Sequence, residues 1–211
     1  IGRLGKEALQ WSGLSRKNQL IYGATLGFTF LSAVEVLDGY SSNWGASVGD
    51  VAANAIGTSI FVSQELLWKE QRIIPKFSFH NTSYASVRPN VLGASYNEQI
   101  IKDYNGQTYW LSFNLSSLSK SAKIPKWFNV AVGYGGDGML TGSEAFANTI
   151  FLPESKRHRQ FYLSLDVDLV RIQTNSTLLK TLFSVVNTIK IPSPTFEING
   201  VGDVRFHYLY F

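Results

Sequence analysis

Two carboxylate-bearing stripes near the N-terminus contain the side chains best suited to chemistry. Glu35 and Asp38 lie three residues apart in one apolar segment, and Asp50 and Asn54 lie four residues apart in the next. Residues three or four apart share one face of a helix, so each pair is expected to project from a single side. If two such helices face each other, the carboxylates converge in an apolar setting, where a raised pKa suits a general acid or base.

The same residues also have a structural explanation, which we favour. Ser47 and Asp50 have the spacing of a capping-box variant at a helix start, and Asn54 is placed to bond across to Glu35. A catalytic pair is the alternative, with Glu35 and Asp38 as acid and base and with Asp50 and Asn54 orienting a substrate. No ligand set at a recognisable metal spacing is visible, so we expect neither a metal nor a cofactor.

These stripes belong to a predicted helical hairpin that occupies residues 1–75. We expect Ser15 to cap a helix over residues 17–37, the polar cluster 38–43 to end it, and a second helix to follow over 47–70. The first helix carries Thr25, Thr29 and Ser32 on the side of Glu35, so it is not a clean transmembrane span. We expect the pair to be buried against protein.

Downstream of residue 75 the apolar residues change from helical to strand spacing. Four segments alternate apolar and polar residues with a period of two. Their apolar sets are Tyr109, Leu111, Phe113 and Leu115; Phe128, Val130, Val132 and Tyr134; Phe161, Leu163, Leu165, Val167 and Leu169; and Val204, Phe206, Tyr208 and Tyr210. The chain stops on the aromatic Phe211.

This alternation is compatible with two kinds of sheet. A soluble antiparallel sheet packs its apolar face on a core, whereas a lipid-facing sheet turns that face to hydrocarbon. We predict an α+β fold in which the hairpin is followed by an antiparallel β-sheet over residues 76–211, with a short amphipathic helix near 176–189. The sheet is expected to form a small outer-membrane barrel or partial barrel, because five or six strands are fewer than the eight of the smallest closed membrane barrels.

Composition favours a membrane-contacting protein. Charged residues make up 16% of the 211 residues, aromatic residues 14%, and the net charge is +4. The one basic cluster, residues 156–159, suits a solvated loop or lipid headgroups, so we expect no nucleic-acid partner. Cysteine is absent, which excludes disulfides and thiolate chemistry.

A glycine-rich run over residues 133–138 superficially suggests a phosphate-binding loop. The lysine and the following helix of such a loop are missing. We therefore expect a flexible turn at a strand end, opening a long connection that reaches residue 152.

Several short motifs resemble those of the YfiM-like family, described as predicted periplasmic or outer-membrane lipoproteins of unknown function. They are Glu35-x-x-Asp38-Gly39, Trp44-Gly45-x-Ser47-x-x-Asp50, Ala53-Asn54-x-x-Gly57 and Gln64-Glu65-x-x-Trp68. The larger Bacteroidetes branch is similar through Lys76-Phe77-Ser78-Phe79-His80, Arg88-Pro89, residues 102–110 and the closing residues 207–211. The resemblance implies export to the Gram-negative envelope and transfers no activity.

We therefore predict a non-enzymatic outer-membrane protein that serves as a structural or accessory subunit of an envelope complex. Its expected partners are lipid of the outer membrane and other envelope proteins. The alternatives are a lipid- or cell-wall-modifying enzyme built on the carboxylate cluster, and a lipid-binding module between helices and sheet.

Overall fold

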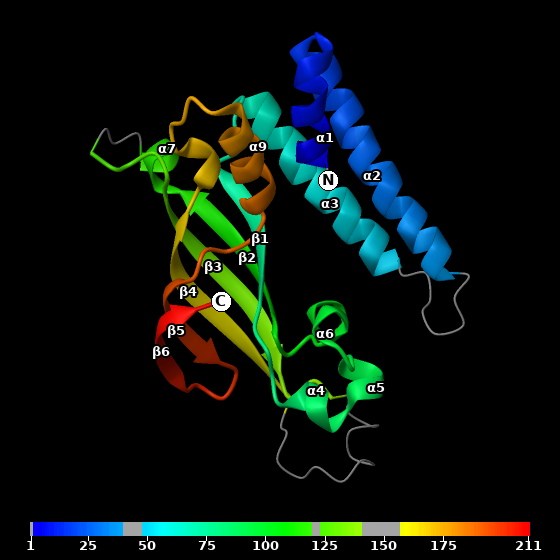
Figure 1. Ribbon diagram of the computed structural model, residues 1–211, viewed down its shortest axis with the longest axis vertical. Coiled ribbons are helices and arrows are strands. Elements are labelled where there is room, and N and C mark those ends of the chain that lie inside the picture. Colours follow the sequence, from blue (N-terminus) through cyan, green and yellow to red (C-terminus); the bar gives the residue numbers. More distant parts are fainter. Residues whose placement is uncertain (1, 40–47, 120–122, 141–156) are drawn as a thin grey trace. The chain divides into compact units, whose positions relative to one another are not determined.

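The computed structural model describes residues 2–39, 48–119, 123–140 and 157–211 (Figure 1). The chain divides into two compact units, residues 1–71 and residues 72–211. The first unit is helical and the second contains the sheet, and each is described by itself.

The helical unit contains α1 (Gly2–Leu9), the 3-10 helix η1 (Gln10–Ser12), α2 (Arg16–Gly39) and α3 (Val48–Leu67). The predicted cap of α2 is confirmed, because the amide of Asn18 donates to Ser15 Oγ at 3.3 Å. The predicted cap at Ser47 lies outside the described residues.

Helices α1 and α2 approach each other through glycines. A Cβ atom on Gly23 would lie 2.6 Å from the amide nitrogen of Lys6 and 2.8 Å from the carbonyl oxygen of Gly2. Only a residue without a side chain fits this backbone-to-backbone contact. Gly23 therefore fixes the distance between α1 and α2.

Helix α2 is mostly exposed in the described part of the chain, and burial of the hairpin helices against protein stays a prediction. Among the described residues, Arg16–Leu37 is the one helical segment long and apolar enough to cross a membrane, and only 17% of its most apolar window is buried. Its exposed side chains include Tyr22, Leu26 and Phe30. Length and composition by themselves do not assign such a helix to a membrane, because core helices and signal sequences share them.

The second unit contains a six-stranded antiparallel sheet in which every strand pairs with its sequence neighbours, in the order β1-β2-β3-β4-β5-β6. The strands are β1 (Ile73–Phe79), β2 (Gln107–Asn114), β3 (Phe128–Asp137), β4 (His158–Val167), β5 (Ser193–Asn199) and β6 (Val204–Tyr210). The connections contain α4 (Tyr84–Val87), α5 (Pro89–Leu92), α6 (Tyr96–Lys102), α7 (Leu115–Ser119), η2 (Leu169–Arg171) and α9 (Thr177–Val186). Figure 1 shows α4, α5 and α6 at one end of the sheet and α7 and α9 at the other.

The sheet curls on itself without closing. The ring of Tyr210, at the end of β6, lies 6.1 Å from that of Trp110 on β2 and 4.6 Å from that of Tyr162 on β4. At the free edge of β1, residues 188–190 add a short parallel bridge, in which Lys190 N donates to Phe77 O at 2.9 Å. The predicted α+β class and the partial-barrel form are thus confirmed, with the sheet open.

The glycine-rich run is not a turn, so that prediction is wrong. Strand β3 continues to Asp137, and Gly133 pairs with Trp110 on one side and Tyr162 on the other. A Cβ atom on Gly133 would lie 2.7 Å from the Trp110 ring, so the missing side chain makes room for the indole. Residues 141–156 of the predicted connection lie outside the described part.

The sequence pattern also predicted the wrong face for Tyr210, which it grouped with Phe206 and Tyr208. The pairing of β5 with β6 shifts by one residue between Ser193 and Thr195, which is the signature of a β-bulge. One extra residue reverses the alternation beyond it, so Tyr208 is exposed whereas Tyr210 is buried.

Candidate functional site

The predicted carboxylate residues lie at the ends of α2 and α3 that are joined by residues 40–47. Glu35 and Asn54 are half-buried, and Asp50 is exposed in the first turn of α3. Asp38 belongs to the last turns of α2, and its side chain lies outside the described residues. The proposed acid and base roles of these four residues stay predictions.

Among the described residues of the helical unit, Glu65 is the buried carboxylate, and the sequence prediction missed it as a charge centre. Its carboxylate lies 2.5 Å from Lys6 Nζ and 3.0 Å from Arg16 Nη2, and it accepts from Gln71 Nε2 at 3.1 Å. Burial by itself would raise the pKa of Glu65, but the hydrogen bonds from Lys6, Gln71 and Arg16 outweigh it and hold the pKa below its usual value. Glu65 therefore joins α1, α2 and α3 as an anion at neutral pH.

The inward face of the sheet is polar and buried. Its buried polar residues on the strands are Lys76, Ser78, Thr108, Ser112, Asn114, Asn129, Ser164, Asp166, Ser193, Thr195, Glu197 and Asn199. A buried polar group is tolerated only when its hydrogen bonds are made, so these residues have to form a network.

Asp166 is the charge centre of this polar interior. Lys76 Nζ lies 2.8 Å from Asp166 Oδ2, and both side chains are fully buried. Ser112 Oγ donates to the same oxygen at 2.6 Å, and Lys190 Nζ lies 4.0 Å from Asp166 Oδ1. The two ammonium groups also donate to carbonyl oxygens, Lys76 to Val167 and Lys190 to Leu165, each at 2.7 Å.

Amides extend the network along the strands. Asn129 Nδ2 donates to Ser112 Oγ at 2.8 Å, and Asn114 Nδ2 donates to Asn129 Oδ1 at 2.7 Å. Neighbouring strands therefore cross-link through side chains as well as through their backbones. Such satisfied networks rigidify an interior that has few apolar contacts.

Aromatic residues fill the space beside the charges. The hydroxyl of Tyr210 donates to that of Tyr162 at 2.7 Å and lies 3.2 Å from Thr108 Oγ1. Lys190 Nζ lies 5.0 Å from the centre of the Trp110 ring, within the range of a cation–π contact. Trp110 is the inward residue of β2 that the sequence pattern left unassigned.

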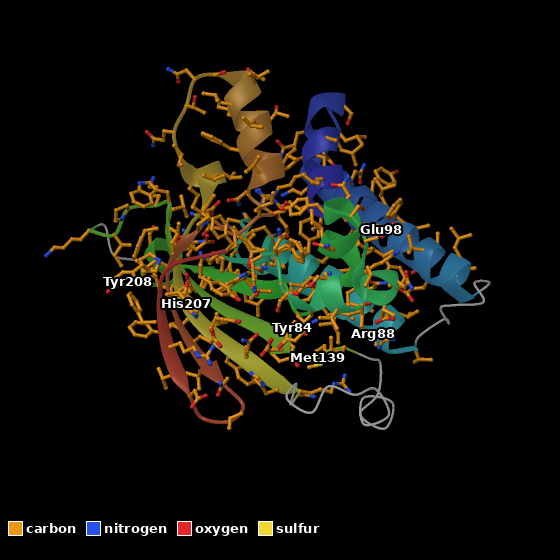
Figure 2. The ribbon with its side chains drawn as sticks, turned by 60° about the horizontal axis from the view of Figure 1, so that its bottom comes forward. Tyr84, Arg88, Glu98, Met139, His207 and Tyr208 are labelled. Carbon is orange, nitrogen blue, oxygen red and sulfur yellow. The ribbon has the colours of Figure 1, made fainter. Side chains whose placement is uncertain are left out.

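The end of the sheet that carries α4, α5 and α6 is fixed by a second polar cluster. Asp103 accepts from Thr82 Oγ1 at 2.5 Å and from Asn105 Nδ2 at 2.8 Å, and the amide of Met139 donates to Asn105 Oδ1 at 2.6 Å. Arg88 Nη1 donates to the carbonyl oxygen of Leu140 at 2.7 Å. Figure 2 shows Arg88 and Met139 in this cluster, so the β1–β2 connection is tied to the end of β3.

Tyr84 in this cluster has a strongly perturbed hydroxyl. Burial, followed by the charge of Asp137 and a hydrogen bond to it, raises the pKa of Tyr84 to about 12. A phenol so difficult to deprotonate is suited to donating a structural hydrogen bond and unsuited to acting as a base at neutral pH.

The outward face of the sheet is apolar and exposed. The strand register arranges its side chains in transverse rows, of which the first is Phe77, Tyr109, Tyr134, Phe161, Ile198 and Val204 and the second is Pro75, Leu111, Val132, Leu163, Phe196 and Phe206. Leu163, at the centre of the sheet, is 51% exposed. The polarity is thus the reverse of that in a water-soluble sheet, which buries its apolar face.

Aromatic residues lie at both ends of this apolar face. Tyr134 and Phe161 are paired near one end, with ring centroids 5.6 Å apart, and Trp127 and Phe128 lie at the other end, 6.2 Å apart. Trp127, just before β3, and Tyr134 are seven positions apart, which is about 23 Å along a strand and about 16–19 Å in height at the tilt of about 35–45° of membrane strands. Membrane barrels have an apolar band about 25 Å tall between two aromatic girdles.

Within the described ranges, no cluster of three or more His, Cys, Asp or Glu residues has a geometry that could hold a metal ion. His207 Nε2 instead lies 2.7 Å from Glu197 Oε2, and Gln160 Nε2 donates to Glu197 Oε1 at 2.9 Å. Figure 2 shows His207 beside Tyr208 on β6.

Residues 2–64 match the model of a family described as "Predicted periplasmic lipoprotein (DUF2279)". The helical unit is thus similar to an uncharacterised family of predicted periplasmic lipoproteins, and this similarity supports a location in the cell envelope. The match does not extend to the sheet. No curated protein and no solved structure matches the chain.

Proposed function

We propose that the β unit is embedded in the outer membrane, with its apolar face against acyl chains, and that the protein is a non-enzymatic structural or accessory component of the envelope. The observation that carries this proposal is the reversed polarity of the sheet. Lysines, carboxylates and amides are buried on its inner face, whereas its outer face exposes leucines, valines and aromatic residues.

Solvation energies support hydrocarbon as the medium around the outer face. Each large apolar side chain left in water forgoes about 1.5–3 kcal/mol of burial free energy. Two complete rows of such side chains form a patch far larger than the isolated apolar residues of ordinary soluble surfaces. In a bilayer the same side chains incur no such cost.

Strand length and residue placement agree with a membrane of ordinary thickness. Strands β3 and β4 contain ten residues each, and a tilted transmembrane strand needs about 9–11. Bilayer-spanning sheets are characteristic of outer-membrane proteins, whose interiors are polar. The YfiM-like assignment, the Bacteroidetes branch and the role as a complex subunit belong to this proposal, as do lipid and envelope proteins as partners.

Single-cysteine labelling tests the proposal directly, because the chain contains no cysteine. The full chain carrying Leu163→Cys is labelled with a polarity-sensitive fluorophore and folded into vesicles of phosphatidylethanolamine and phosphatidylglycerol. We expect a blue-shifted emission that nitroxide lipids quench and aqueous iodide does not.

Two matched positions serve as controls. Val201→Cys lies in the exposed turn between β5 and β6 and should be quenched by iodide, whereas Ser164→Cys, next to Leu163 but inward-facing, should resist labelling in the folded protein. Quenching of the Leu163→Cys label by iodide, or its shielding from both quenchers, would contradict a lipid-facing sheet.

A further inference from the structure

Helix α9 presents an apolar stripe that nothing in the β unit covers among the described residues. Leu178, Leu182 and Val185 follow one another at spacings of four and three residues, so they lie along one line of the helix, and Ile189 follows four residues later, beyond its C-terminal end. Leu178 is 77% exposed, and the other three are exposed by half or more. Lys180 lies about 200° around the helix from Leu178, on the opposite side.

The helix is held firmly in this orientation. Ser176 Oγ accepts from the amide of Leu179 at 3.3 Å at its start. At its end, the fully buried Asn187 accepts from the amide of Leu169 at 2.8 Å and donates to Asp168 Oδ1 at 3.0 Å. The exposed stripe is therefore a fixed feature of the fold.

The stripe continues into the outward face of the sheet. Ile189 forms a parallel bridge with Phe77, and paired residues in a sheet project to the same side. Phe77 belongs to the first outward row. Lys190, the residue that follows Ile189, is buried on the inner side near Asp166. Ile189 therefore joins the stripe of α9 to the apolar exterior.

The C-terminal end of α9 is held near an aromatic residue at one end of the apolar face. The amide of Asp168, which holds Asn187, donates to the carbonyl oxygen of Trp127 at 2.8 Å. Trp and Tyr are enriched where a membrane meets water. Asn187, at the C-terminal end of α9, is thus held near Trp127, and Ile189, two residues later, lies beside Phe77.

The geometry points to α9 as an interfacial helix, whose apolar stripe rests on the lipid at the headgroup boundary while Lys180 faces the aqueous side. Amphipathic helices in this position bury an apolar face a few ångströms deep and keep their cations toward the headgroups. This inference rests on the proposed membrane insertion of the sheet. The outward face of the sheet and the stripe of α9 form one apolar surface, so the lipid that covers the first is expected to reach the second.

The test compares the depths of labels in the same vesicles. The full chain carrying Leu182→Cys or Lys180→Cys is labelled with the same fluorophore, and quenching is measured with nitroxides placed near the headgroup and deep in the acyl chain. We expect the Leu182→Cys label to be quenched chiefly by the shallow nitroxide, the Lys180→Cys label chiefly by iodide, and the Leu163→Cys label more strongly by the deep nitroxide.

The outcomes separate this inference from the proposed function. Lipid quenching at Leu163→Cys combined with iodide quenching at Leu182→Cys overturns the interfacial helix and leaves the inserted sheet intact. Shielding of Leu182→Cys from both quenchers also overturns it, since a protein surface, such as a second copy, would then cover α9. Iodide quenching at Leu163→Cys contradicts the inserted sheet itself.

Discussion

The two faces of the β-sheet share one alternation of residues and have opposite surroundings. On β4, Phe161, Leu163 and Leu165 point outward and are exposed, whereas Tyr162, Ser164 and Asp166 point inward and are buried. In a soluble sheet the first set would form the core. Alternation of apolar and polar residues along a strand therefore shows that the strand has two different faces, but it does not identify which face is exposed.

Each face is stabilised by a different kind of interaction. The inner face depends on hydrogen bonds and charges, such as those that join Lys76, Ser112 and Asp166. The outer face makes few contacts within the unit and depends on its medium. Substitutions on the two faces should therefore respond differently to the presence of a bilayer.

The largest effect is expected from Asp166→Asn. The change leaves the buried ammonium groups of Lys76 and Lys190 without their anion, and removing one partner of a buried pair costs about 3–5 kcal/mol. Urea unfolding in vesicles and in detergent micelles should show this loss in both media. Asp203→Asn, in the exposed turn after β5, is the control and should change stability by less than about 0.5 kcal/mol. If Asp166→Asn and Asp203→Asn have equal free energies of unfolding, water reaches the inner face and solvates its charged groups.

A somewhat smaller effect is expected from Leu163→Arg, and only in lipid. A cation on the lipid face near the bilayer midplane costs about 2–4 kcal/mol. Vesicle unfolding should show this loss, whereas Val201→Arg in the turn should be nearly neutral. If Leu163→Arg leaves the free energy of unfolding in vesicles unchanged, the outward face of the sheet lies in water.

Gly133→Ala tests the packing of the inner face. The new Cβ would lie 2.7 Å from the Trp110 ring, and such overpacking typically costs about 1–3 kcal/mol. Gly57→Ala in α3 is the matched control, because no atom lies within 4 Å of its added Cβ, and it should stabilise its helix by up to about 1 kcal/mol. Changes of the same sign at both positions would argue against the tight Trp110 contact.

The smallest effect is expected from titration of Glu65, a buried charge outside the sheet. Its pKa is lowered in the folded state, so its contribution is present at neutral pH and is lost as the pH falls below 4.5 through the folded pKa. Amide hydrogen exchange of α1, α2 and α3 in the full chain should accelerate over that range. Glu65→Gln should remove this pH dependence, and a dependence that persists in the variant would assign it to another group.

The extent to which the sequence predicted the molecule differs between the fold and the candidate site. Alternation over β2, β3 and β4 predicted the strands and their faces, because side chains on a strand must alternate. It failed at Tyr210, where a bulge reversed the faces. The glycine content of residues 133–138 wrongly predicted a turn, because Gly133 serves a packing contact with a residue 23 positions earlier in the chain. Neither feature leaves a local signal.

Charged centres were harder to predict than strands. Helical spacing drew attention to Glu35 and Asp50, because residues on one helix face are recognisable in sequence. The partners of Asp166, however, come from β1 and from the segment after α9, and those of Glu65 from α1 and α2. Residue pairs separated by tens of residues have no fixed spacing in the sequence, so no local pattern predicts them.

The sequence by itself determined the helical and β regions, the two opposed faces of each strand and the amphipathic character of α9, since these follow from the periods of helix and strand. Only the tertiary structure decided that the polar face is enclosed, that Asp166 meets two lysines there, and that the apolar face and the stripe of α9 form one exterior. The physical reason is that enclosure depends on how the sheet curls and on which distant residues meet across it.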